Sequence, residues 1–126
     1  MTGPKPLPLQ GPGDKFHEAG IFVVQQVLTE AGWTIRDTAT LFKGLAVGNR
    51  VPDLFATRRE GDKNVRLVVE VQSRPAKKEM AERRAYYTDR YPLLADRFCE
   101  IPLYKLRPTK RDSLKAIREI VELNLA

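Results

Sequence analysis

Residues 51–72 read VPDLFATRREGDKNVRLVVEVQ and carry the clearest structural pattern in the chain. Val51 to Thr57 has the composition of a strand, with a proline near its start. Glu60 to Asn64 is rich in turn-forming residues, and Val65 to Gln72 is a second, more apolar run. We therefore predict an antiparallel hairpin with strands at 51–57 and 65–72, the second of them at the centre of a sheet.

Glu70 interrupts the apolar run of the second strand. Successive side chains of a strand point to opposite faces, so Glu70 and Gln72 share one face with Val68 while the intervening residues point the other way. A buried carboxylate is costly unless it is paired, protonated or bound to a metal. If the hairpin brings Asp53 next to Glu70, a divalent cation best relieves the repulsion between the two carboxylates. Oxygen ligands favour Mg²⁺, with Mn²⁺ as the alternative. Such an ion can activate a water molecule for the hydrolysis of a phosphodiester, and Gln72 could orient that water.

The segments before the hairpin predict a helix, a short strand and a loop. Apolar residues recur at helical spacing from Phe16 to Val27, which indicates a helix at 14–31 that Gly32 would end. Alternation at 33–36 predicts a strand, and 38–50, with glycines and no sustained period, is expected to be a loop. Residues 1–13 contain four prolines and three glycines and are expected to form a flexible arm.

The segments after the hairpin predict a helix, a strand and a second helix. A helix is expected at 76–90, and a strand at 98–106, where Pro102 indicates an edge position or a bend. Thr109 and Asp112 resemble a capping box that starts a final helix reaching Leu123. The expected buried face of this helix consists of Leu114, Ile117 and Val121. The order α-β-β-β-α-β-α over residues 14–126 predicts one domain of the α/β class.

Composition limits the class of protein. The chain has 126 residues, 42% of them hydrophobic and 30% charged, which suits one globular domain and excludes a wholly disordered chain. No apolar run approaches the roughly 20 residues of a membrane span, and the N-terminus lacks the apolar stretch of a signal peptide. We therefore expect a cytoplasmic protein with no membrane partner. Cys99 is the single cysteine, which excludes an internal disulfide and a Cys-x-x-Cys zinc site, and it is expected in the core.

The net charge of +6 favours a polyanionic partner, nucleic acid first, because a basic side chain near a phosphate releases condensed counterions. The charge is unevenly distributed. Six basic residues and one acid lie between Lys105 and Arg118, and a second basic cluster surrounds the segment 76–90. The residues that we predict to contact nucleic acid are Lys43, Arg50, Arg74, Lys77, Lys78, Arg84, Lys110 and Arg111.

The order of elements, together with Pro52-Asp53 and Glu70-Val71-Gln72, is similar to the core of the PD-(D/E)XK nuclease superfamily and is closest in pattern to the small Holliday junction resolvases. The resemblance covers residues 14–105. It implies a three-layer, restriction-endonuclease-like domain with a mixed central sheet, and a Mg²⁺-dependent endonuclease that hydrolyses phosphodiester bonds of DNA. It also implies a symmetric homodimer, with Asp53 and Glu70 as metal ligands, Gln72 as the water-activating position and Glu18 as the glutamate that resolvase-like members carry on the first helix.

Gln72 departs from the family pattern, which usually has lysine there. A neutral amide cannot stabilise hydroxide by charge, although some members of the superfamily have glutamine or glutamate at this position. A displaced lysine could compensate, and Lys43, Lys77 and Lys78 are the candidates. Two other functions stay open. One is a catalytically inactive nuclease-fold module that binds nucleic acid or assembles with a partner, and the other is a nuclease acting on RNA, which this sequence does not distinguish from DNA.

The site residues also have plainer interpretations. Asp53 could be a turn residue at the end of a strand, and Glu70 a glutamate that faces solvent from a half-exposed sheet. His17 and Glu18 could be ordinary residues of a helix start, where the helix dipole favours an acid. The positions of these four side chains in the fold therefore decide between a site and a surface.

Overall fold

The computed structural model describes residues 15–38, 52–90 and 95–125. The predicted arm at 1–13 and nearly all of the predicted loop at 38–50, including Lys43 and Arg50, lie outside these residues. The elements are α1 (Lys15–Glu30), β1 (Thr34–Arg36), β2 (Leu54–Glu60), β3 (Lys63–Gln72), α3 (Lys77–Arg84), the π-helical turn η2 (Ala85–Arg90), β4 (Arg97–Pro102) and α4 (Leu114–Leu125). The described part is thus a mixed α/β fold, and its helices and strands follow the predicted order.

The four strands form one mixed sheet in the order β1-β2-β3-β4. The pairs β1–β2 and β2–β3 are antiparallel, whereas β3 and β4 are parallel. The predicted hairpin is confirmed, and it closes on a two-residue turn in which Gly61 has a φ of +66°, a conformation that glycine adopts without strain. The first strand of the hairpin, β2, begins at Leu54 and not at the predicted Val51, so Pro52 and Asp53 precede it. The strand starts after Pro52 because proline has no N–H to donate to the ladder.

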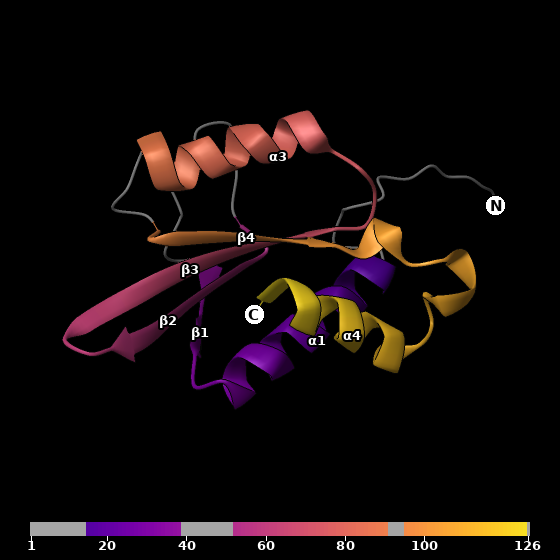
Figure 1. Cartoon of the computed structure of the whole chain (residues 1–126), viewed down its shortest axis with the longest axis horizontal. Coiled ribbons are helices and arrows are strands. Elements are labelled where there is room, and N and C mark those ends of the chain that lie inside the picture. The colour runs from indigo at the N-terminus through magenta and orange to yellow at the C-terminus, as the bar shows by residue number, and fades with distance from the viewer. Residues whose placement is uncertain (1–14, 39–51, 91–94, 126) are drawn as a thin grey trace.

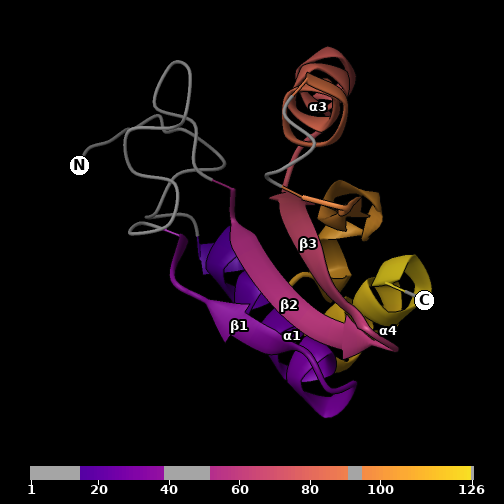
Figure 2. The ribbon, with the colours of Figure 1, turned by 90° about the vertical axis from the view of Figure 1, so that its left-hand side faces the viewer.

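Helices cover both faces of the sheet, with α3 on one side and α1 and α4 on the other (Figures 1 and 2). The side facing α1 and α4 contains Leu67, Val69 and Val71, whereas Val68 packs with Tyr87 and the other aromatic residues beneath α3 and η2. The predicted alternation along β3 is therefore confirmed. It puts Glu70 and Gln72, which have the same parity as Val68, on the side of α3.

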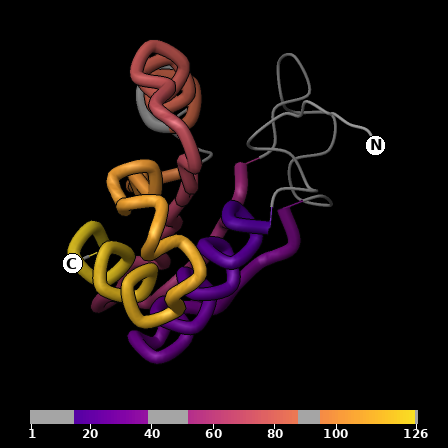
Figure 3. Tube along the Cα trace, turned by 90° about the vertical axis from the view of Figure 1, so that its right-hand side faces the viewer, coloured from indigo at the N-terminus to yellow at the C-terminus, as the bar shows by residue number. Residues whose placement is uncertain are grey.

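The helix α1 lies beside α4 along the same face of the sheet (Figure 3). It ends at Glu30, and Gly32, the residue predicted to end it, follows in a turn with a φ of +91°; the N–H of Trp33 donates to the carbonyl of Leu28 at 3.0 Å. In the middle of α1, Gly20 is buried against Leu103 and Val71. The absence of a side chain at this position lets the helix approach the end of β3.

Gly20→Ala is expected to lower the free energy of unfolding by about 1–3 kcal/mol, although alanine favours helix by about 1 kcal/mol. A Cβ at this position would overlap Cδ1 of Leu103 and lie 3.0 Å from Cγ1 of Val71. Urea denaturation of the variant measures the loss. Thr29→Ala, at an exposed position of the same helix, serves as the control and should cost no stability. Equal stability of Gly20→Ala and wild type would contradict this close approach.

Two boundaries and the burial of one residue differ from the predictions after β3. The strand β4, at the edge of the described sheet, ends at Pro102 instead of 106, and Leu103–Lys105 form a 3-10 turn. The last helix starts at Leu114 and not at Thr109, because Ser113 supplies the cap: its Oγ accepts the N–H of Ala116 at 3.1 Å. Leu114 was expected in the core, but it is 56% exposed, because it lies in the first turn of the helix.

The remaining core predictions are confirmed in part. Ile117 and Val121 are fully buried. Cys99 is half-buried against the core, where burial raises the pKa of its thiol to about 11 and its Sγ donates to the carbonyl of Asn124 at 3.0 Å. None of the helices in the described segments is long and apolar enough to span a membrane.

Candidate active site

Asp53 and Glu70 meet at the end of the β2–β3 hairpin that is opposite the turn. Leu54 pairs with Val69, so the register brings the preceding residue, Asp53, next to Glu70, which is the condition on which the predicted site depends. The N–H of Val71 donates to Oδ2 of Asp53 at 2.7 Å and fixes this carboxylate against β3. The two acids therefore belong to one cluster and are neither a separate turn residue nor a solvent-facing glutamate.

The carboxyl group of Glu70 is only 1% exposed. Its Oε1 accepts a hydrogen bond from Nη1 of Arg83 at 2.7 Å, whereas its buried Oε2 has no hydrogen-bond partner among the described residues. Burial raises the pKa of Glu70 well above the usual value, and the nearby charge of Asp53 raises it further, while Arg83 acts in the opposite direction. Two ionised carboxylates present only acceptors to each other, so this pair calls for a shared proton or a cation.

His17 contacts Asp53 from the other side of the sheet. It is 5% exposed on α1, and its Nε2 lies 3.2 Å from Oδ2 of Asp53. Glu18, the helix residue implied by the family resemblance, is exposed, and within the described part of the chain it is His17 that contacts Asp53. Helical spacing could have indicated this, because His17, Gly20 and Val24 form one buried stripe.

Arg83 is a further member of the cluster that the sequence did not identify. Its Nη1 and Nη2 donate to Glu70 and Glu79, each at 2.7 Å, and its side chain is 19% exposed. Tyr87, one turn further along, is fully buried, and its pKa is raised first by burial and then by the charge of Glu70. The available signal was the spacing of Glu79, Arg83 and Tyr87 at four-residue intervals, which puts them on one side of a helix.

The other predicted site residues lie around this cluster in different settings. Gln72 is 4% exposed and lies two residues beyond Glu70 on the same face of β3. Arg84 is engaged elsewhere: its Nη2 donates to Glu100 at 3.0 Å and its guanidinium lies over the ring of Phe98. Arg111 stacks over Phe16 at 4.9 Å. Exposed side chains that follow the ends of β3 and β4 are those of Arg74, Lys77, Lys78 and Lys110.

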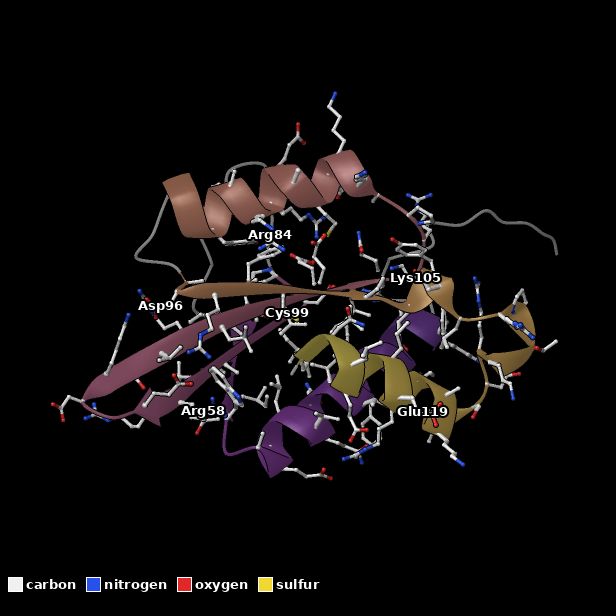
Figure 4. The ribbon with its side chains drawn as sticks, in the orientation of Figure 1. Arg58, Arg84, Asp96, Cys99, Lys105 and Glu119 are labelled. Carbon is white, nitrogen blue, oxygen red and sulfur yellow. The ribbon has the colours of Figure 1, made fainter. Side chains whose placement is uncertain are left out.

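Charge pairing differs between the two ends of the sheet. Figure 4 shows Asp96 and Lys105 at opposite ends of β4. Ion pairs neutralise Arg58 and Arg97 on Glu60, Arg66 on Asp96, and Arg118 on Glu30 and Glu122. The cations after the ends of β3 and β4 form no ion pair within the described residues; we call them the basic surface, and they are Arg74, Lys77, Lys78, Lys105, Arg107 and Lys110.

A metal site at the cluster would depend on two protein carboxylates. Across residues 15–38, 52–90 and 95–125, no group of three or more His, Cys, Asp and Glu side chains is arranged to hold a metal ion. Mg²⁺ usually binds through one or two carboxylates and completes its shell with water and substrate oxygens. The donors Asp53 and Glu70, with one buried oxygen unpartnered, therefore fit Mg²⁺ or Mn²⁺ better than a metal that needs a closed protein cage.

A separate cavity of about 550 Å³ lies between α1, α4 and the sheet. Leu28, Trp33, Leu67 and Cys99 are among its lining residues, and none of the carboxylate cluster contributes to it.

Comparison of the chain with protein-family models, with curated proteins and with solved structures finds no match. A function for this protein is therefore inferred from its own geometry.

Proposed function

We propose that this protein is a metal-dependent nuclease of restriction-endonuclease-like layout that hydrolyses DNA phosphodiester bonds, with Asp53 and Glu70 as the ligands of Mg²⁺ or Mn²⁺. One observation carries the proposal: two adjacent carboxylates, one of them almost completely buried, present an oxygen without a partner among the described residues, at one end of the inner strands β2 and β3. Burial of a carboxylate beside a second one is costly, and carboxylate pairs of this kind are typical of functional sites.

Each side chain of the cluster has a task in this proposal. A bound cation would polarise the phosphodiester and provide hydroxide near neutral pH. The N–H of Val71 and Nε2 of His17 both contact Oδ2 of Asp53, and these two contacts hold the carboxylate in place for this role. Gln72, on the same face as Glu70, would orient the attacking water through its amide. Arg83 donates to Oε1 of Glu70, and Oε2 has no hydrogen-bond partner among the described residues.

The basic surface supports a nucleic-acid substrate. Its cations lie at the same end of the sheet as Asp53 and Glu70, since β3 and β4 run parallel and end together at Gln72 and Pro102. Unpaired lysines and arginines beside a carboxylate site attract a polyanion and orient its phosphates toward the site. DNA is favoured over RNA by the family resemblance alone. A homodimer and a cytoplasmic location also stay predictions.

A cleavage assay tests the proposal. The purified protein is incubated with plasmid, linear duplex, single-stranded and branched DNA and with RNA, in Mg²⁺, Mn²⁺ or EDTA. We expect cutting of DNA that requires the metal, and preference for branched DNA would identify a resolvase-like enzyme. Cutting of RNA alone would redirect the proposal to RNA, and no cutting with either metal would contradict it.

A second candidate is favoured by the ion pair between Arg83 and Glu70. Because this guanidinium already neutralises part of the carboxylate charge, the cluster could be maintained without a metal. The protein would then be an inactive nuclease-fold module that binds nucleic acid or assembles with a partner. Salt-sensitive binding of nucleic acid without cleavage would support this candidate, and absence of binding would contradict both.

Lys77→Ala is expected to weaken binding of nucleic acid and to reduce the slope of log affinity against log salt by about 0.9 if the lysine contacts one phosphate of a duplex. Lys77 belongs to the basic surface and is exposed at the start of α3. Fluorescence anisotropy of a labelled duplex across a range of NaCl concentrations measures the slope. The control is Lys63→Ala at the hairpin turn, whose Nζ lies 3.6 Å from Asp96 and which should leave the slope unchanged. Equal slopes for both variants would rule out this surface.

A further inference from the structure

Arg83 lies at the point where the cluster needs positive charge. Gln72, at the motif position where a lysine would lie, is neutral. Arg83 comes instead from the covering helix α3 and donates to two carboxylates, with Nη1 on Glu70 and Nη2 on Glu79, each at 2.7 Å. The planar guanidinium can hold two separate acceptors at once, which a lysine ammonium on a single flexible stem does less well.

Among the described residues, the carboxylates of the cluster outnumber its basic side chains. Asp53, Glu70 and Glu79 carry three negative charges when ionised, against the single positive charge of Arg83. The difference is two negative charges if His17 is neutral, which one divalent cation would neutralise. The unpartnered Oε2 of Glu70, on a side chain only 1% exposed, supplies an acceptor for it.

We propose that Arg83 is a positioning residue that sets the metal affinity of the Asp53–Glu70 pair, because it competes with the divalent cation for Glu70. The inference rests on the proposed function in that it takes these carboxylates as the metal ligands. When the cation takes over Glu70, Nη2 of Arg83 still has Glu79 as an anchor, so the guanidinium stays beside the site. There it supplies to a substrate phosphate the positive charge that Gln72 lacks.

Binding of Mn²⁺ to the full chain, measured by the electron paramagnetic resonance signal of free Mn²⁺, tests the competition without any need for activity. Arg83→Met keeps the length of the side chain and removes the charge. It is expected to bind Mn²⁺ at least about tenfold more tightly than wild type, because a positive charge a few ångströms from the cation is lost. The matched control is Arg84→Met, the next residue, which pairs with Glu100 outside the cluster and should leave the affinity unchanged.

A second variant changes the affinity in the opposite direction. Glu79→Gln leaves Arg83 with Glu70 as its ionised partner and removes a negative charge near the site, so Mn²⁺ should bind several-fold more weakly. The side chain of Glu79 is 36% exposed, so this variant is expected to fold, and circular dichroism verifies the fold of every variant. If Arg83→Met does not fold, Arg83→Lys replaces it. Because lysine holds two separate acceptors less well than arginine, this variant is expected to bind Mn²⁺ more tightly than wild type does.

The outcomes separate this inference from the proposed function. Wild type that binds Mn²⁺, with equal affinity in Arg83→Met, overturns the inference alone. Binding that appears only in Arg83→Met supports the competition and contradicts the metal-dependent nuclease, while no binding in either protein overturns both. For an active wild type, tighter Mn²⁺ binding together with a lower kcat in Arg83→Met supports the phosphate contact, and an unchanged kcat overturns that part.

Discussion

Glu70→Gln is expected to reduce metal-dependent cleavage by roughly three orders of magnitude, because a bound metal contributes several kcal/mol of transition-state stabilisation. Glutamine preserves the volume of the side chain and an oxygen that can accept the hydrogen bond from Arg83, but it removes the negative charge. Asp53→Asn should have the same effect while still accepting the N–H of Val71. Single-turnover rates in Mg²⁺ on the preferred substrate measure both losses.

Glu100→Gln provides the matched control. Glu100 pairs directly with Glu70 in the register of β3 and β4, yet its carboxylate is 32% exposed and is bound to Arg84. The same chemical change one strand away should leave the cleavage rate within about threefold of wild type, since exposed ion pairs contribute little. A loss as large as that of Glu70→Gln would mean that net charge, and not a metal ligand, controls the rate.

The hairpin and its two acids could be predicted because their information is local. The turn at Gly61 fixes the register, and the register alone brings Asp53 to Glu70. Alternation along β3 likewise determined which side chains face α3. Boundaries were less accurate where two signals competed, as at Thr109 and Ser113, either of which could cap a helix.

The rest of the cluster could not be predicted because it depends on how helices pack on the sheet. His17 meets Asp53 across 36 positions of sequence, and Arg83 meets Glu70 across 13. Neither of these two contacts follows from strand register or from a capping motif. The sequence offered Lys43, Lys77 and Lys78 as replacements for the missing lysine. Lys43 lies outside the described residues and the other two are exposed, whereas the described cation that contacts Glu70 is Arg83. Residues of the same charge were distinguished only by the orientation of α3.

The carboxylate pair is also expected to make the metal-free protein less stable as the pH rises. The pKa of Glu70 is raised in the folded state, first by burial and then by Asp53, above its value of about 4.3 in an unfolded chain. The folded state therefore binds this proton more tightly, and the stabilising contribution is complete below the unfolded pKa. It is lost as the pH rises from there through the folded pKa, by at most about 1.4 kcal/mol for each pH unit.

Glu70→Gln should escape this loss, since its amide does not titrate. Urea denaturation in EDTA should show that wild type and Glu70→Gln are nearly equally stable near pH 4 and that Glu70→Gln becomes increasingly more stable than wild type toward neutral pH. A saturating divalent metal should stabilise wild type alone, by about 2.7 kcal/mol at a hundredfold excess over its Kd. Asp96→Asn gives the opposite sign, because Arg66 holds the pKa of Asp96 at about 2 and the contribution of this carboxylate is present above the unfolded pKa. If Glu70→Gln instead became relatively less stable with rising pH, the ion pair with Arg83 would outweigh burial, and the cluster would be stabilising without a metal.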